Sequence, residues 1–179
     1  MYTYCLSCGA GKNEDVALLA KALFSCRTII PKHIQPVWDK KLKQMSNRIQ
    51  ELFPGYVFLY SEEKLDVTRI QQVGTIIRWI HGGPDSCELT GSDQAFAQFM
   101  LEKEGFLGKT LVCMNQETMR LYFPPEMFHD ADVSIQKVVK RNHKMEIAIR
   151  LLGETVHIWV EYEIVPEEAF QDRTIPGKK

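Results

Sequence analysis

The sequence predicts an α+β fold in two parts, an α/β sandwich followed by a small all-β barrel. In the first hundred residues, short apolar runs alternate with two or three segments whose apolar residues recur at helical spacing. After Gly105 the helical spacing disappears, and apolar residues alternate with polar ones as in strands with one buried face. With 179 residues, 45% of them hydrophobic, the chain is long enough to build two small cores.

The N-terminal part begins with a short apolar and aromatic run, residues 2–8, which predicts a strand. Gly9 and Gly11 follow it and predict a turn. Asn13 is then placed to cap a helix, because asparagine is one of the preferred residues at that position. The helix is expected to bury an apolar stripe formed by Val16, Leu19, Ala20 and Leu23.

The middle of the N-terminal part contains its clearest strand. Residues 28–30 predict a short strand, whereas residues 32–50 show little periodicity and are expected to be irregular and basic. The turn-forming pair Pro54-Gly55 then introduces a strand over 56–60. Because strand side chains alternate, one face of this strand should carry Tyr56, Phe58 and Tyr60.

The rest of the chain completes the two parts. Residues 65–73 predict a helix, 75–80 a strand and 92–101 a closing helix. Strand patterns then cover 111–114 and 133–139, and a β-hairpin covers 145–162 with Gly153-Glu154 in its connection. We therefore expect an N-terminal domain over 1–101, a linker over 102–118, a barrel over 119–168 and a tail over 169–179.

Composition excludes several classes of protein. The formal net charge of −1 excludes a uniformly basic coat for nucleic acid, and no apolar run is long enough for a membrane helix. No secretory segment is visible, so a cytoplasmic protein is expected. The protein is also expected to be a monomer. The five cysteines are an odd number, and Cys5 and Cys8 form a lone CxxC without further ligands, so neither a disulfide scaffold nor a metal site is predicted.

No catalytic site is predicted either. Gly108-Lys109-Thr110 looks like the end of a phosphate-binding loop, but Lys103 occupies the position of the first glycine. The histidines are dispersed and form no recognisable catalytic arrangement. The sequence therefore predicts a binding protein without a cofactor rather than an enzyme.

One motif carries a family resemblance. Residues 52–59 read LFPGYVFL, and this run resembles the signature of the N-terminal (NGN) domain of the NusG family of transcription elongation and antitermination factors. Lys137-Val138-Val139 and the hairpin around Gly153 resemble a KOW domain. The resemblance implies an NGN-type α/β sandwich followed by an SH3-like KOW barrel. Length and polarity resemble the specialised LoaP and RfaH classes as much as housekeeping NusG.

The chain departs from the KOW signature at one position. By alignment, Asp130 stands where that signature carries a glycine. Aspartate tolerates a left-handed backbone better than most residues, so the turn is expected to survive.

The resemblance implies that the chain binds the clamp helices of RNA polymerase and promotes processive elongation and antitermination. An aromatic strand face can receive a partner helix, and aromatic side chains are enriched in such interfaces. The positions that the resemblance assigns to polymerase binding are Leu6, Ser7, Phe53, Tyr56, Phe58 and Thr68. The alternative for the aromatic strand is that its side chains are ordinary core.

Two basic segments are candidates for nucleic-acid contact. Lysine and arginine side chains bind phosphates, and an exposed tryptophan stacks on unpaired bases. The candidate residues are Trp38, Lys40, Lys41, Lys43 and Arg48 in the first segment and Lys137, Lys140, Arg141 and Lys144 in the second. The resemblance implies upstream or non-template DNA and nascent RNA as partners, with a ribosomal protein or a termination factor as a further partner of the barrel. Ordinary solvated loops remain the alternative for both segments.

A different function is also compatible with the barrel. A ribosome-associated or RNA-binding KOW protein without polymerase contact would carry the same basic hairpin. It would not account for the aromatic strand in a separate α+β domain, and binding to isolated clamp helices separates the two functions.

Overall fold

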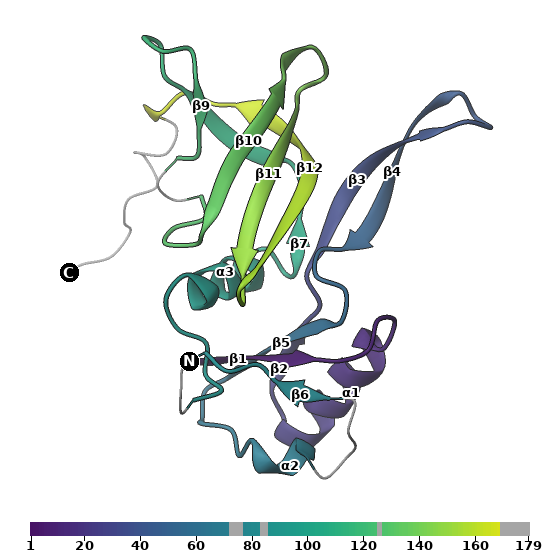
Figure 1. Ribbon diagram of the computed structural model, residues 1–179, viewed down its shortest axis with the longest axis vertical. Helices are drawn as coiled ribbons and strands as arrows, with labels where there is room; N and C mark the ends of the chain where they lie inside the picture. Colours follow the sequence, from purple (N-terminus) through teal and green to yellow (C-terminus); the bar gives the residue numbers. More distant parts are fainter. Residues whose placement is uncertain (72–76, 83–85, 125–126, 169–179) are drawn as a thin grey trace.

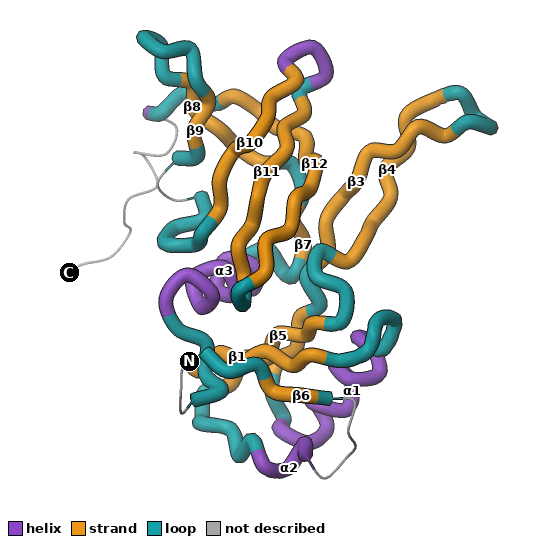
Figure 2. The backbone as a smooth tube through the Cα atoms, viewed as in Figure 1, coloured by secondary structure: helices purple, strands orange, loops and turns teal. Residues whose placement is uncertain are grey.

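The fold is described by a computed structural model covering residues 1–71, 77–82, 86–124 and 127–168 (Figure 1). It confirms the predicted α+β class: a four-stranded sheet flanked by helices is followed by a five-stranded, nearly closed barrel. The chain trace in Figure 2 shows a long hairpin that leaves the sheet domain and stands beside the barrel. None of the helices in these residues has the length and apolar character needed to cross a membrane.

The N-terminal sheet has the strand order β2-β5-β1-β6. Its two central strands pair antiparallel over their full length, from Tyr2 opposite Ser61 to Ser7 opposite Tyr56. The four strands are β1 (Tyr2–Ser7), β2 (Arg27–Ile29), β5 (Tyr56–Ser61) and β6 (Arg78–Trp79).

Helices cover both faces of this sheet because its central strands are apolar on both sides. Leu6, Val57 and Leu59 pack in one core with α1 (Asn13–Phe24). Phe58 and Tyr60 pack on the other face with α3 (Gly91–Glu102). Both long helices were predicted from their apolar spacing. Ser25 caps the C-terminus of α1 in a left-handed backbone conformation.

The expected helix over 65–73 and strand over 75–80 are shorter than predicted among the described residues. Only α2 (Thr68–Gln71) and β6 (Arg78–Trp79) form, and residues 72–76 lie outside the described part.

The prediction that residues 32–50 are irregular is wrong. They form a β-hairpin of β3 (Lys32–Asp39) and β4 (Gln44–Glu51), and β7 (Phe106–Leu107) pairs parallel with the base of β3. The alternation was obscured because apolar residues on one face of the hairpin are exposed: Trp38 is 56% exposed and Ile49 is 62% exposed. A strand is recognised in a sequence when one of its faces is buried and therefore apolar, and little of this hairpin's surface is buried.

The barrel has the strand order β10-β11-β12-β8-β9, with β12 parallel to β8. The predicted hairpin is confirmed, and its two-residue turn, Leu152-Gly153, has positive φ at both positions, as a tight hairpin turn requires. Asp130 has a φ of 58°, so it takes the left-handed backbone expected in place of glycine. The strands are β8 (Thr110–Met114), β9 (Leu121–Tyr122), β10 (Val133–Val139), β11 (Lys144–Leu151) and β12 (Glu154–Ile164), with a 3-10 turn at Lys140–Asn142.

The barrel and the sheet domain share one continuous core. Phe96, Phe99 and Met100 of α3 belong to the same buried cluster as Met145 and Ile147 of β11. The stretch expected as a linker, 102–118, contains β7 and β8, so only Gly108 and Lys109 separate the last strand of the hairpin sheet from the first strand of the barrel. The domain boundaries themselves stay a prediction.

Candidate functional site

The turn between β4 and β5 presents Tyr56 at the edge of the sheet. Gly55 has a φ of 87°, and its carbonyl accepts a hydrogen bond of 2.7 Å from the backbone N–H of Cys8. The Tyr56 N–H donates to the Phe53 carbonyl at 3.2 Å, which closes the turn. The turn therefore fixes the direction in which the chain enters β5.

Asn13 braces this turn instead of capping α1. The helix begins at Asn13 itself, and the residue in the cap position, Lys12, makes no side-chain capping hydrogen bond. The Asn13 side-chain oxygen accepts from the Gly55 N–H at 3.1 Å, and its amide donates to Glu51 at 3.2 Å and to the Tyr56 carbonyl at 3.4 Å. The N-cap prediction is wrong because the buried side chain of Asn13 forms hydrogen bonds with the neighbouring turn instead of capping the helix.

The residues predicted to bind polymerase do not all lie on one surface. Ser7, Phe53, Tyr56 and Phe58 face the α3 side of the sheet, with Ser7 directly opposite Tyr56 in the strand register. Leu6 is fully buried on the opposite face against α1.

Thr68 lies at the exposed start of α2, where its hydroxyl donates to the Asp66 carboxylate at 2.7 Å. This helix covers the face of the sheet that Leu6 occupies, not the face of Tyr56 (Figure 1). In this arrangement, Leu6 and Thr68 do not contribute to one surface with Tyr56.

An aromatic cluster runs from the turn to the barrel. Phe53 makes edge-on contacts with Tyr56 at 6.4 Å and with Phe96 of α3 at 5.9 Å between ring centroids. On the far side of α3, Phe99 lies 4.5 Å from the barrel residue Phe128. Edge-on and tilted ring pairs of this kind add to the stabilisation from burial. Phe53 and Phe58 are 2% and 0% exposed, so Tyr56 is the aromatic residue of β5 that reaches the surface.

Two hydrogen bonds join the barrel hairpin to this surface. The Tyr56 hydroxyl donates to the Glu154 carboxylate at 3.2 Å, and the Leu152 N–H donates to the Asp93 carboxylate, in the first turn of α3, at 2.9 Å. Partial burial, together with the negative charge of Glu154, raises the pKa of Tyr56. The β11–β12 turn therefore covers part of the surface around Tyr56.

Among the comparisons with known proteins, the one with solved structures supports the fold. No protein-family model matches the chain, and no curated protein matches its sequence. Among solved structures, a study of domain interaction in Thermotoga maritima NusG gives a match with 14% identity and a TM-score of 0.52. The match covers 89% of this chain and 93% of that chain, and therefore includes both the sheet domain and the barrel. The chain has the NusG fold.

Within this NusG-like fold, the two basic segments lie at one end of the molecule. The tip of the β3–β4 hairpin carries Lys40, Lys41 and Lys43, and the turn between β10 and β11 carries Lys140 and Arg141. Figure 1 shows both turns pointing away from the N-terminal sheet. Among the remaining candidates, Trp38 and Arg48 are exposed, and the Lys137 ammonium lies 5.9 Å from the ring centroid of Trp159.

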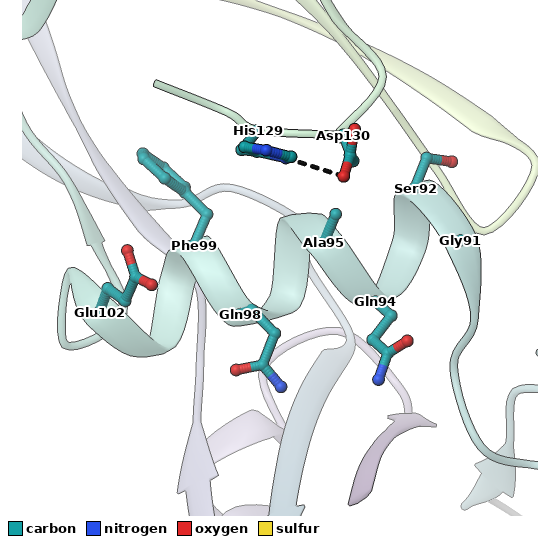
Figure 3. A pocket seen from close by; sticks show the side chains of 9 residues that line it. All are labelled: Gly91, Ser92, Gln94, Ala95, Gln98, Phe99, Glu102, His129 and Asp130. Carbon is teal, nitrogen blue, oxygen red and sulfur yellow. Dashed lines mark ion pairs between the residues drawn. The ribbon is translucent and has the colours of Figure 1, made fainter. Parts of the chain in front are cut away.

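A cavity of about 920 Å³ lies between α3 and the loop before β10. Figure 3 shows His129 and Asp130 above the helix surface formed by Ala95 and Phe99. The His129 and Asp130 side chains approach to 2.7 Å and are largely exposed. The two side chains are therefore paired with each other at the surface. The cavity is a broad groove along the domain junction.

The cysteines do not form a metal site among the residues that the structure describes. Cys5 is fully buried in the sheet, and burial raises the pKa of its thiol well above the ordinary value. Cys8 lies beside Asn13, and burial raises its pKa as well. Both therefore behave as small apolar residues around β1.

Three residues of the site were not found from the sequence: Asn13 as a brace, Asp93 and Glu154. Asp93 and Glu154 bind partners 59 and 98 residues away along the chain. An acidic residue in the first turn of a helix is ordinarily explained by the helix dipole, so the sequence carries no signal for these contacts.

His33 is expected to make the stability of the fold sensitive to acid. Its side chain is 5% exposed, and burial lowers its pKa below the ordinary value of 6.5. Below about pH 6.5 the unfolded chain therefore binds more protons than the folded chain, and stability is expected to fall as the pH drops. His33 lines a small cavity between the β3–β4 hairpin and the barrel, and Glu51 and His157 are the other titratable residues that line it. Urea unfolding between pH 5 and pH 7.5 measures this slope.

The His33→Gln variant is expected to flatten the slope, whereas His143→Gln, at an exposed position, serves as the control. Equal slopes for wild type and His33→Gln would contradict the assignment.

Proposed function

We propose that this protein binds the clamp helices of RNA polymerase through the surface around Tyr56 and promotes processive elongation and antitermination. The observation that carries the proposal is the FPGY turn in a NusG-like fold. It holds one half-exposed tyrosine over a rigid aromatic cluster. Rigid aromatic side chains with a polar end are frequent anchors in protein interfaces. Phe53 packs edge-on against Tyr56, and Ser7 lies next to it in the sheet.

Polymerase binding through Tyr56 requires the barrel hairpin to move. The Tyr56 hydroxyl donates its hydrogen bond to Glu154, and the N–H of Leu152 in the same turn donates to Asp93. Domain interaction is described for Thermotoga maritima NusG, and we propose that this chain shares it. Clamp helices and the hairpin would then compete for one surface, so that weakening the hairpin contact strengthens polymerase binding.

The basic turns are proposed to contact nucleic acid. Lys40, Lys41, Lys43, Lys140 and Arg141 would neutralise phosphates of upstream or non-template DNA or of nascent RNA. The barrel is also proposed to recruit a ribosomal protein or a termination factor. An operon-specific role, as in the LoaP and RfaH classes, belongs to the same proposal.

Binding of fluorescent clamp helices to purified variants tests the polymerase contact. Tyr56→Ala is expected to weaken binding at least tenfold, because the loss of a central aromatic anchor commonly costs about 2 kcal/mol or more. Tyr56→Phe and Glu154→Ala each remove only the hydrogen bond to the barrel. Such a bond contributes about 1 kcal/mol, so these variants are expected to bind about fivefold more tightly than wild type.

The matched control is Leu18→Ala, because Leu18 is an exposed apolar residue on α1, on the other side of the sheet. Transcription through an intrinsic terminator with the cognate polymerase should follow the same order of variants. If wild type binds neither clamp helices nor polymerase, the proposal fails, and the RNA-binding alternative without polymerase contact replaces it.

A further inference from the structure

A small cavity of about 220 Å³ lies between the base of the β3–β4 hairpin and the outer side of the barrel. It is below the size typical of drug-like ligands, about 300–1,000 Å³, but equals the volume of about seven water molecules. The hairpin wall is formed by His33, Gln50, Glu51 and Leu52, and the barrel wall by Val156, His157, Ile158 and Trp159. Both walls carry polar groups, so the cavity suits a small polar and planar group.

His33 supplies a buried polar atom to this cavity. Its Nδ1 is buried and has no hydrogen-bond partner among the described residues. An unpaired buried nitrogen is costly, so a position of this kind calls for a bound partner. Burial also lowers the pKa of His33, which keeps the ring neutral and able to accept as well as donate a hydrogen bond.

Gln50 adds a second hydrogen-bonding group on the same wall. It stands directly opposite His33 in the β3–β4 register, so both side chains lie on the hairpin face that is turned to the barrel. Its amide offers a donor and an acceptor at once. Neighbouring donors and acceptors of this kind match the edge of a nucleic-acid base.

The opposite wall offers an aromatic surface. Trp159 is half-buried on the outer side of β12, and Lys137 lies over its ring. On the hairpin, Arg48 is exposed and is two residues from Gln50, on the same face. The cavity therefore has a stacking ring on one side, hydrogen-bonding groups on the other, and a cation beside each wall.

The surroundings favour a single strand over other polar ligands. Figure 2 shows the hairpin tip and the β10–β11 turn at the same end of the molecule. A strand whose base enters the cavity would pass between the two basic turns, where phosphates meet lysine and arginine side chains. Combined stacking and backbone neutralisation is the usual way in which proteins bind unpaired nucleic acid.

We infer that this cavity, the hairpin–barrel pocket, binds one unstacked base of a single-stranded nucleic acid. The base stacks on Trp159 and bonds to His33 and Gln50, while Lys137 and Arg48 contact the flanking phosphates. The inference deepens the proposed nucleic-acid contact and rests on it, but it does not require the polymerase contact. It also places the base between elements of both domains, so binding depends on the docked barrel.

Binding of RNA oligomers about ten nucleotides long to the full chain tests the pocket. The four homopolymers are compared with an abasic sugar-phosphate oligomer of equal charge. Trp159→Ala is expected to lower affinity for the best homopolymer about tenfold and to leave the abasic oligomer unchanged, because stacking on one ring is lost. Trp159→Phe keeps an aromatic face and should retain most of the affinity. Gln50→Ala should reduce the preference among the four bases.

Ile49→Ala is the matched control, since Ile49 is exposed and belongs to the same hairpin but occupies its other face. Trp38→Ala tests the outer hairpin, where the sequence offers a candidate for base stacking. Thermal unfolding of each variant excludes a folding defect. If Trp38→Ala weakens binding and Trp159→Ala does not, the strand contacts the outer hairpin and the pocket inference is overturned, while the proposed function stands. If wild type binds no oligomer, both the pocket and the proposed nucleic-acid contact fail. The proposed polymerase contact is then tested separately by clamp-helix binding.

Discussion

Replacing Phe58 with alanine is expected to lower the free energy of unfolding by about 3–5 kcal/mol. Phe58 is 0% exposed, lies in the central strand β5 and packs 6.5 Å from the ring of Phe96. Its removal leaves a cavity that strands on both sides of β5 prevent from collapsing. Denaturant unfolding followed by circular dichroism measures the change as a lower midpoint.

Tyr56→Ala is the control for this prediction. Tyr56 is half-exposed on the same strand face, so its loss is expected to cost clearly less stability. Equal midpoints for wild type and Phe58→Ala would show that α3 does not cover this face. The difference matters for the proposed function, because a Phe58 variant that loses activity reports on folding, whereas a Tyr56 variant reports on the surface.

Replacing Gly55 with alanine is expected to destabilise the protein by about 2 kcal/mol or more, because two effects add. Its φ of 87° lies in a region that side chains with a Cβ rarely adopt. A Cβ would also lie 2.6 Å from the Cys8 carbonyl oxygen, which is backbone and cannot easily move. The glycine of the FPGY motif is therefore required by the close approach of the β1–α1 loop.

Gly153→Ala separates the two effects. Gly153 has a similar φ of 81°, but nothing lies within 4 Å of a Cβ placed there. This variant should therefore show only the conformational cost, about 1 kcal/mol. The two thermal midpoints, measured under one set of conditions, give the comparison. A Gly55→Ala variant no less stable than Gly153→Ala would refute the clash.

Much of the fold could be predicted because burial leaves a periodic trace in the sequence. Helices α1 and α3 each bury one side, and β10, β11 and β12 alternate around a core, so all five were found. The β3–β4 hairpin was missed because its outer part is stabilised mainly by backbone hydrogen bonds between the strands, which leave no apolar pattern in the sequence. Trp38 and Ile49 on its exposed face gave no burial signal.

The candidate site was predicted less completely, for a different physical reason. Alternation correctly placed Tyr56, Phe58 and Tyr60 on one strand face, but it could not show which element covers that face. Helix α3 buries Phe58 and Tyr60 and leaves only Tyr56 partly accessible. The hydrogen bond from Tyr56 to Glu154 depends on how two domains dock, which is a property of the assembled chain.

The short connection between β7 and β8 limits how the barrel can move. Gly108 and Lys109 alone join the two strands, and two extended residues span only about 7 Å. When the β11–β12 turn separates from Tyr56, the barrel therefore stays close to the sheet domain, because this short connection limits its distance. Its return is an intramolecular event at high local concentration, so the uncovered state should be brief unless another molecule occupies the surface. Greater reach would require β7 to peel from β3, a separation of only two paired residues.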